Sequence, residues 1–432
     1  MKKLFSLLLA ATMTFSLTLP ALADHYTYSE PEKSTMMPRS TPETHGMSSQ
    51  YILDLLDAFD YADAEVHNIL MAIDGEVVFE GHYAPYTALD PHIMFSGTKI
   101  FTNAAVGVAV TEGYLHLDDY VYDVLKDYVT QDVSELQSKV QLKHLLTMTS
   151  GVDRFMSGSE LRPLTTSWIE HILTEPIVHE PGTYYLYSSG NTMLSSAMVT
   201  VATGKTCLEL LNTTGFCEEL GIKNFTWDMS PDGFNAGHGG IKITAEDLAK
   251  VGQLYMNGGV WNGKQILSKE WCDLAIGYEK TVENQGDYAY HWTAYEDGLY
   301  YTATGSYGQT LAICPKLNMV IAIQAGTKQN IGELLYQNIF KPYGDALAAG
   351  TVPEPDDALS AALAKRAENL NLMFTTDFTA SPIGELVDDV TFTAAENQYG
   401  ITTLSLDVHD DYIDYLSLIH ISEPTRRRGI SY

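Results

Sequence analysis

The sequence has few cysteines for its length, and this shortage excludes several classes of site. Cys207, Cys217, Cys272 and Cys314 are the four cysteines in 432 residues. None forms a C-x-x-C pair, and the thirteen histidines show no H-E-x-x-H spacing, so we expect no metal and no redox centre. Cys207 and Cys217 can pair in an exported protein, but free buried thiols agree equally well with the sequence.

Positive charge is also scarce. The chain has 25 Lys and Arg against 55 Asp and Glu, which gives a formal net charge of −30. A strongly acidic surface repels phosphate backbones and anionic lipid headgroups, so we expect no nucleic-acid partner. The excess charge is explained most simply as an aid to solubility.

Long apolar runs are lacking beyond the first twenty residues. Lys2 and Lys3 precede an apolar stretch from residue 4 to 19, and residues 21–23 form the small-x-small site Ala-Leu-Ala. This pattern predicts a signal peptide over 1–23, cleaved near Ala23, and therefore a secreted, extracellular or periplasmic protein. The stretch is short for a membrane span and no cysteine follows the cleavage site, so we expect no stable membrane anchor.

The next part of the chain, residues 24–345, predicts one large α+β domain. An early helix and a hairpin around Asp74-Gly75 precede a mostly helical middle, and β-rich segments return afterwards. The expected segments are a helix at 51–62, strands at 69–73 and 76–80, helices within 115–274, and strands at 300–304, 310–314 and 319–323. We therefore expect an antiparallel sheet flanked by helices, with a large helical insertion.

The composition changes after residue 345. Pro353 and Pro355 mark a linker over 346–355, and a short helix followed by alternating residues makes 356–417 the start of a small, truncated β-rich domain. Residues 418–432 do not continue that alternation and resemble translated sequencing-adapter sequence. We interpret them as a non-native tail and leave them out of the fold prediction.

The pentad Phe95-Ser96-Gly97-Thr98-Lys99 contains the one S-x-x-K in the chain, at the start of an apolar run. Residues three apart on a helix share a face, so the lysine amine can lie beside the serine hydroxyl. A serine needs a base to become a nucleophile, and burial at a helix start disfavours a charged ammonium. Ser96 and Lys99 are thus a candidate nucleophile and base, but the motif is too short to decide this alone.

Two further segments support the motif. Tyr187 lies in Tyr-Ser-Ser-Gly-Asn at 187–191, and a phenol beside a lysine loses its proton readily enough to relay one. Residues 303–309, Ala-Thr-Gly-Ser-Tyr-Gly-Gln, place glycines between β-rich segments, where the amides of Ser306 and Ser96 can form an oxyanion hole. A surface turn with an incidental tyrosine and a plain hairpin turn are the alternatives.

These segments, in this order, resemble the penicillin-recognising serine hydrolases. The resemblance is to the class C β-lactamase-related branch, which includes esterases, D-amino-acid peptidases and 6-aminohexanoate-dimer hydrolase-like enzymes. Residues 144–151, His-Leu-Leu-Thr-Met-Thr-Ser-Gly, are similar to the family's LLTHTSG segment, with Met148 in place of the usual histidine. Gly239-Gly240 resembles a glycine-rich stretch near the family's site, and His238 beside it is expected to be structural.

The resemblance implies a β-lactamase/transpeptidase-like fold that works without a cofactor. It implies that Ser96 is acylated, that Lys99 is the general base and that Tyr187 is a second proton carrier. The backbone amides of Ser96 and Ser306 would form the oxyanion hole. The residues that would contact the substrate are Ser189, Asn191, Thr304, Gly305 and Gln309.

Two positions depart from the family pattern. Ser189 replaces the asparagine of Y-x-N, and Ala303 replaces the Lys or His before Thr-Gly, so a cation for a β-lactam carboxylate is missing. We therefore expect an exported serine hydrolase that cleaves small-molecule or peptide esters or amides. The alternatives are a D-amino-acid peptidase or weak β-lactamase on cell-wall-like substrates, and a non-catalytic homologue that binds peptidoglycan or acyl ligands. The sequence does not predict the oligomeric state.

Overall fold

A computed structural model describes most of the chain from residue 36 onward. It describes 36–372, with gaps at 224, 278–281, 283, 285–286, 297, 352 and 355, and then 387–393, 401–408, 412–419 and 425–431. The predicted signal peptide lies outside these residues. Within the described residues, no helix is long and apolar enough to cross a membrane.

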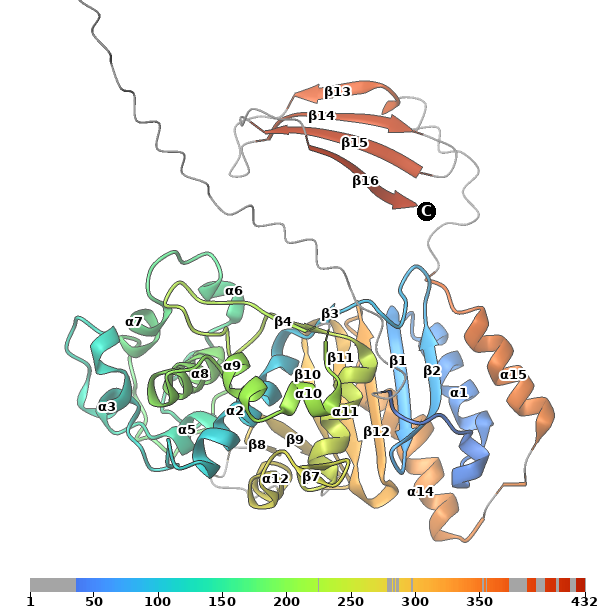
Figure 1. Cartoon of the computed structure of the whole chain (residues 1–432), viewed down its shortest axis with the longest axis horizontal. Helices are drawn as coiled ribbons and strands as arrows, with labels where there is room; N and C mark the ends of the chain where they lie inside the picture. Colours follow the sequence, from blue (N-terminus) through green and yellow to red (C-terminus); the bar gives the residue numbers. More distant parts are fainter. Residues whose placement is uncertain are drawn as a thin grey trace, which may run out of the picture.

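The main domain is built on a seven-stranded antiparallel sheet (Figure 1). Its order is β2-β1-β12-β11-β10-β9-β8, so the early hairpin pairs with the last strand of the domain. The strands are β1 (Val66–Ile73), β2 (Glu76–His82), β8 (Tyr288–Ala289), β9 (Trp292–Tyr295), β10 (Tyr300–Gly305), β11 (Gln309–Cys314) and β12 (Met319–Ala325).

Helices cover both faces of this sheet. Every residue of β1 is buried: Ile69 and Met71 belong to one core and Leu70 and Ala72 to the other. The first core is closed by α1 (Ser49–Tyr61), α13 (Ile331–Leu335), α14 (Lys341–Ala348) and α15 (Asp357–Glu368). The second is closed chiefly by α2 (Lys99–Thr111), α8 (Ser189–Thr203) and α11 (Ala245–Met256).

The helical insertion lies between the early hairpin and the late strands, as predicted. Its other helices are α3 (Val121–Leu125), α4 (Glu135–Ser138), α5 (Leu142–Leu146), α6 (Gly158–Leu161), α7 (Trp168–Leu173), α9 (Cys207–Thr213), α10 (Phe216–Leu220) and α12 (Lys269–Ile276). Short strands accompany them, namely β3 (His92–Ile93), β4 (Thr226–Trp227), β5 (Ile241–Ile243), β6 (Val260–Trp261) and β7 (Lys264–Gln265). The predicted α+β fold with flanking helices is therefore confirmed.

The C-terminal part contains a second sheet of four antiparallel strands. These are β13 (Val390–Thr393), β14 (Ile401–Val408), β15 (Tyr412–Ile419) and β16 (Thr425–Ser431). We expected residues 418–432 not to continue the strand pattern, but β16 lies in this segment and pairs with β15. Whether residues 418–432 are native to the protein stays a prediction.

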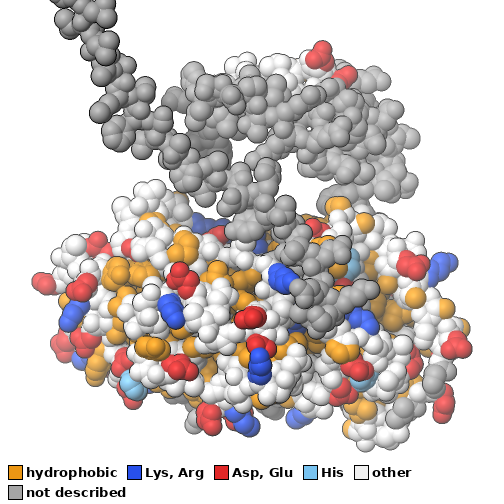
Figure 2. All heavy atoms as spheres, viewed as in Figure 1, with side chains coloured by type: hydrophobic (Ala, Val, Ile, Leu, Met, Phe, Trp, Pro, Cys, Tyr) orange, Lys and Arg blue, Asp and Glu red, His pale blue; other side chains and the backbone are white. Residues whose placement is uncertain are grey.

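The four cysteines are all buried and free, so Cys207 and Cys217 do not pair in this structure. On the face shown in Figure 2, acidic and basic side chains are interspersed. The excess of negative charge is therefore not gathered in a single patch on that face.

Candidate active site

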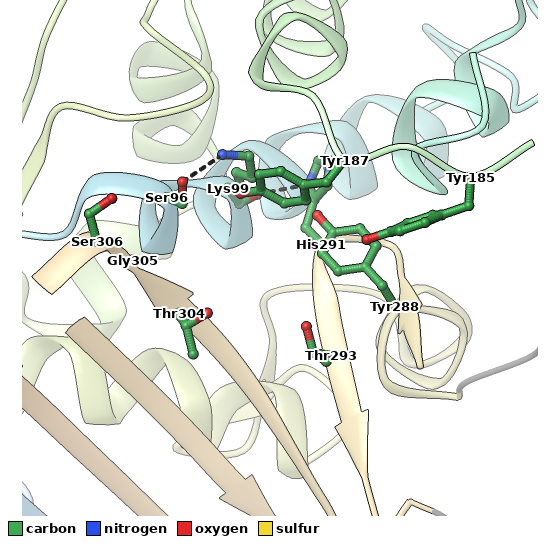
Figure 3. Close-up of a pocket in the computed structure, with 10 residues that line it drawn as sticks. All are labelled: Ser96, Lys99, Tyr185, Tyr187, Tyr288, His291, Thr293, Thr304, Gly305 and Ser306. Carbon is green, nitrogen blue, oxygen red and sulfur yellow. Dashed lines mark hydrogen bonds between the residues drawn. The ribbon is translucent and has the colours of Figure 1, made fainter. Parts of the chain in front are cut away.

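Ser96 and Lys99 lie at the junction of two helices. Phe95–Thr98 form a 3₁₀ turn and α2 begins at Lys99. Side chains at i and i+3 of a 3₁₀ turn are nearly eclipsed, which brings the two groups together. The Lys99 Nζ donates a hydrogen bond of 3.0 Å to the Ser96 Oγ (Figure 3).

Lys99 is almost completely buried and is surrounded by neutral groups. Its side chain is 1% exposed, and its Nζ also donates to the backbone oxygen of His238 at 3.1 Å. The Nζ lies 4.9 Å from the centre of the Tyr187 ring. No carboxylate of the described residues forms an ion pair with Lys99. The amine can therefore take the serine proton without breaking a salt bridge.

Tyr187 is held in place by the loop that contains Met148. The amide of Leu186 donates to the Met148 oxygen at 2.9 Å, and the amide of Ser188 lies 3.5 Å from the Met148 sulfur. Among the described residues the Tyr187 hydroxyl has no hydrogen-bond partner. We expected the phenol oxygen beside the amine, whereas the structure places the ring face over it, a cation–π arrangement.

The end of β10 lies very close to the turn Phe95–Thr98, which carries Ser96. A Cβ added to Gly305 would lie 2.1 Å from the backbone oxygen of Met94, so only glycine can occupy this position without a shift. Ser306 follows directly, at the start of the turn Ser306–Gly308. This packing fixes the Ser306 segment beside the Ser96 segment, as an oxyanion hole built from their two amides requires.

A cavity of about 320 Å³ opens over these groups. Figure 3 shows Ser306 and Gly305 on one side of Ser96, and Tyr187, Tyr185 and Tyr288 on the other. The described residues that line the cavity are Ser96, Lys99, Tyr185, Tyr187, Tyr288, His291, Thr293, Thr304, Gly305 and Ser306. The structure thus brings together the predicted nucleophile, base, proton carrier and oxyanion segment, and their catalytic roles stay predictions.

The family model named Beta-lactamase matches residues 67–331, which is more than half of the chain and includes every group just described. The chain belongs to the beta-lactamase family. A 6-aminohexanoate-dimer hydrolase of Paenarthrobacter ureafaciens is 24% identical over 274 residues, which cover 57% of this chain and 69% of that protein. This relative supports the branch of the family that the sequence motifs indicated.

Solved structures show the beta-lactamase family fold. A Bacillus anthracis protein named as a 6-aminohexanoate-dimer hydrolase has a TM-score of 0.61 and 21% identity, over 74% of this chain and 89% of that one. A family VIII carboxylesterase has a TM-score of 0.55 and 14% identity, over 71% and 99% of the two chains. At these identities the similarity is evidence for the fold, so the chemistry must be argued from the site itself.

Three of the predicted substrate contacts are not brought to the cavity. Gln309 is fully buried, and its amide nitrogen donates to the oxygens of Ser306, Tyr307 and Ala325. Asn191 is buried and accepts a 2.8 Å hydrogen bond from Ser150, and its Nδ2 lies 3.4 Å from the Met148 sulfur.

The third residue, Ser189, is buried in the first turn of α8. In this chain, therefore, Gln309 holds the turn Ser306–Gly308 in place, while Asn191 links the start of α8 to the Met148 loop. The other two predicted contacts, Thr304 and Gly305, do line the cavity.

Ala303 and His238 also differ from catalytic groups in their placement. The Ala303 side chain is 3% exposed and belongs to the core, whereas the next residue, Thr304, lines the cavity. His238 contributes its backbone oxygen to Lys99, and its buried ring packs against Trp168. Burial and the nearby Lys99 lower the pKa of His238 to about 3. This placement agrees with a structural role for His238, which stays a prediction.

Sequence reasoning missed four residues of the cavity: Tyr185, Tyr288, His291 and Thr293. His291 is buried and its Nδ1 donates to the Lys99 backbone oxygen at 3.0 Å, while burial and the Lys99 charge lower its pKa to about 3. Burial raises the pKa of Tyr185 to about 12 and that of Tyr288 well above its usual value. The sequence around β8 and β9 carries no glycine-rich or catalytic motif that would have marked them.

One cluster in the described part of the chain has metal-ligand spacing. Ligand atoms of Glu160, His171 and Glu175 lie within 4.8 Å of one another. Arg154 already pairs with both carboxylates, with a contact of 2.8 Å to Glu160. The guanidinium occupies the anionic centre that a cation would need, so the cluster is explained as an ion-pair network.

Proposed function

We propose that the chain is an exported serine hydrolase that cleaves ester or amide bonds through an acyl-enzyme on Ser96. The observation that carries this proposal is the 3.0 Å hydrogen bond between the Lys99 Nζ and the Ser96 Oγ inside the cavity. Relatives named a 6-aminohexanoate-dimer hydrolase and a carboxylesterase support an amide- or ester-cleaving enzyme.

In the acylation step, Lys99 in its neutral amine form accepts the proton of the Ser96 hydroxyl as the oxygen attacks the substrate carbonyl. The amides of Ser96 and Ser306 stabilise the negative oxygen of the tetrahedral intermediate. Tyr187 then gives a proton to the leaving oxygen or nitrogen, the carbon–leaving-group bond breaks, and the acyl group stays on Ser96.

In the deacylation step, water enters the place that the leaving group has vacated. The same groups act in reverse: a water proton passes to the Tyr187 and Lys99 pair, the hydroxide attacks the ester carbonyl, and Ser96 regains its proton as the acid leaves. No group outside the cavity lining is needed.

The cavity favours uncharged substrates over β-lactams. Among the described residues that line the cavity, Lys99 is the one with a cationic side chain, and it is already directed at Ser96 and His238. A penicillin carboxylate would therefore find no unengaged cation among the described lining residues, which supports the expectation drawn from Ala303. A D-amino-acid peptidase, a weak β-lactamase and a non-catalytic binding protein are the competing functions.

The test is intact-mass spectrometry after treatment with a fluorophosphonate and, separately, with a penicillin. A single fluorophosphonate adduct should form on the wild type and not on Ser96→Ala. Ser306→Ala is the matched control, because it removes a cavity hydroxyl but keeps the backbone amide, and it should be labelled. A wild type that forms no adduct would support the binding protein, and rapid penicillin acylation would support the peptidase or β-lactamase.

Export has its own test. N-terminal sequencing of the protein recovered from outside the cytoplasm of an expressing bacterium should give a chain that starts near Asp24. Retention of residues 1–23 in a cytoplasmic product would contradict this part of the proposal.

A further inference from the structure

An exposed aromatic ring stands next to the proposed proton carrier. The side chain of Phe155 is 53% exposed, which is unusual for a large apolar group. Its ring stacks on that of Tyr187, with 6.1 Å between centres and 28° between planes. Phe155 is not itself a lining residue, but its ring continues the row of rings from Tyr187 towards the surface.

The loop that carries Phe155 is anchored on both sides. Arg154 pairs with Glu160 and Glu175, and the buried Met156 accepts the amide hydrogen of Ser189 at 2.9 Å. The neighbours of Phe155 in sequence thus hold its exposed ring against Tyr187.

Inside the cavity the aromatic wall continues. Tyr187 meets Tyr288 edge-on, with 5.7 Å between centres and 88° between planes, and Tyr288 in turn lies 5.9 Å from Tyr185. Figure 3 shows these three rings together on the side of Ser96 that is opposite Ser306. Burial raises the pKa of the Tyr185 and Tyr288 hydroxyls above the usual value, so these two phenols stay neutral at physiological pH.

The position of this wall identifies the part of the substrate that it meets. If Tyr187 protonates the leaving group, that group must lie against Tyr187, while the carbonyl oxygen points to Ser306 on the other side. The described residues of the cavity lining include no carboxylate and no guanidinium. A ring that lies there meets aromatic side chains and, among the described residues, no carboxylate that would pair with a cationic leaving group.

We propose that Tyr185, Tyr187, Tyr288 and Phe155 form a leaving-group subsite that selects uncharged aromatic alcohols or amines. This inference rests on the proposed Ser96 mechanism. In the step concerned, the Ser96 oxygen bonds to the acyl carbon, the bond from that carbon to the aromatic alcohol oxygen breaks, and the departing oxygen takes the Tyr187 proton.

The test compares two esters that differ in aromaticity and little in leaving-group acidity, benzyl acetate and cyclohexylmethyl acetate. The wild type should show a higher kcat/KM for the benzyl ester by about three- to tenfold, the range expected for one good ring contact. Phe155→Ala and Phe155→Leu should remove most of this preference. Both esters give the same acetyl-enzyme, so the deacylation rate constant should not depend on which ester is used.

Tyr307→Ala is the matched control. Tyr307 is 52% exposed, nearly as exposed as Phe155, but its ring packs on Phe95 at the oxyanion side, with 5.5 Å between centres. This variant should keep the benzyl-to-cyclohexylmethyl ratio of the wild type, whatever its absolute rate.

The possible failures are distinguishable. If Ser96-dependent hydrolysis occurs but the ratio is near one, or is unchanged in both Phe155 variants, the aromatic subsite is wrong and the serine mechanism stands. If neither ester is hydrolysed and no fluorophosphonate adduct forms on Ser96, the proposed function fails and the subsite fails with it.

Discussion

Replacing Gly305 by alanine tests whether β10 and the nucleophile turn form one preorganised unit. The added Cβ would lie 2.1 Å from the Met94 backbone oxygen. That oxygen also accepts the amide hydrogen of Gly97 at 2.8 Å, inside the turn that carries Ser96. The methyl group therefore presses on the nucleophile segment from the strand that delivers Ser306.

The size of the effect follows from this distance. A tolerable contact of about 3.2 Å requires one of the two segments to move by roughly 1 Å, and a misplacement of that size in a catalytic site costs about 10²-fold in rate. Complete loss of one oxyanion-hole donor costs about 10²–10³-fold. We therefore expect Gly305→Ala to lower kcat/KM for p-nitrophenyl acetate by about 10²-fold, equivalent to about 2.7 kcal/mol of transition-state stabilisation.

Gly239→Ala is a matched control for this substitution. Gly239 also lies beside the nucleophile turn, but a Cβ there would meet its nearest neighbour, the Phe95 backbone oxygen, at 3.8 Å, an ordinary contact. Its kcat/KM should stay within about twofold of the wild type. The assays are steady-state ester hydrolysis, the rate of fluorophosphonate labelling and thermal unfolding of each variant.

Two results would refute this reasoning. A folded Gly305→Ala enzyme with nearly normal kcat/KM would show that the Ser306 segment does not hold the oxyanion. Equal losses in Gly305→Ala and Gly239→Ala would show that the site tolerates no added methyl group anywhere near it, so the 2.1 Å contact would explain nothing.

Three further predictions concern the proton carriers, specificity and pH. Lys99→Met and Tyr187→Phe should each lower kcat/KM for esters by about 10²-fold or more with little change in Tm, and a nearly normal Tyr187→Phe enzyme would leave this tyrosine a structural role. Nitrocefin should be turned over at least about ten- to a hundredfold less efficiently than p-nitrophenyl acetate, because a missing charge-assisted contact costs about 1.5–3 kcal/mol; equal efficiencies in a side-by-side assay would contradict this. His238 and His291 have pKa values of about 3 in the folded protein against 6.5 for the ordinary side chain, so the unfolded state binds more protons below pH 6.5. Each should therefore lower the free energy of unfolding by up to about 1.4 kcal/mol per pH unit as the pH falls from 6.5 towards 3, and urea unfolding at pH 7 and pH 5 should reveal a decrease that is smaller in His291→Gly.

Much of the main domain could be predicted from the sequence because its local signals agree with its packing. The Asp74-Gly75 turn joins β1 and β2 as expected, Ser48 caps α1, and Thr244 caps α11 through the amide of Asp247. The long pairing of β1 with β12 connects residues about 250 positions apart, so no local pattern could show it. The family motifs supplied that connection by implying the fold.

The site was predicted where its residues stand in short motifs and missed where they depend on tertiary contacts. Ser96, Lys99 and Ser306 each belong to a recognisable string. Tyr288 and His291 enter the cavity because the β8–β9 hairpin folds against the start of α2, and no string in the sequence records that contact. Asn191 and Gln309 were expected to contact the substrate but do not line the cavity, and this error also comes from tertiary contacts. Their amides satisfy buried backbone and side-chain groups that only the folded loops create.

Backbone geometry explains why local rules fail most at this site. Residues with left-handed φ away from the cavity are mostly of types that tolerate it, such as Asp74, Asn262 and Asn318. Apart from Glu296, the large side chains with left-handed φ in the described chain are in or near the segments of the candidate site: Phe95, Met148, Tyr290, His291 and Tyr307. Such conformations cost about 1–3 kcal/mol each and persist only when the surrounding packing fixes them. Phe95 directly precedes Ser96, Tyr307 directly follows Ser306, and Met148 accepts hydrogen bonds from the residues on either side of Tyr187, so these strained positions adjoin the proposed machinery.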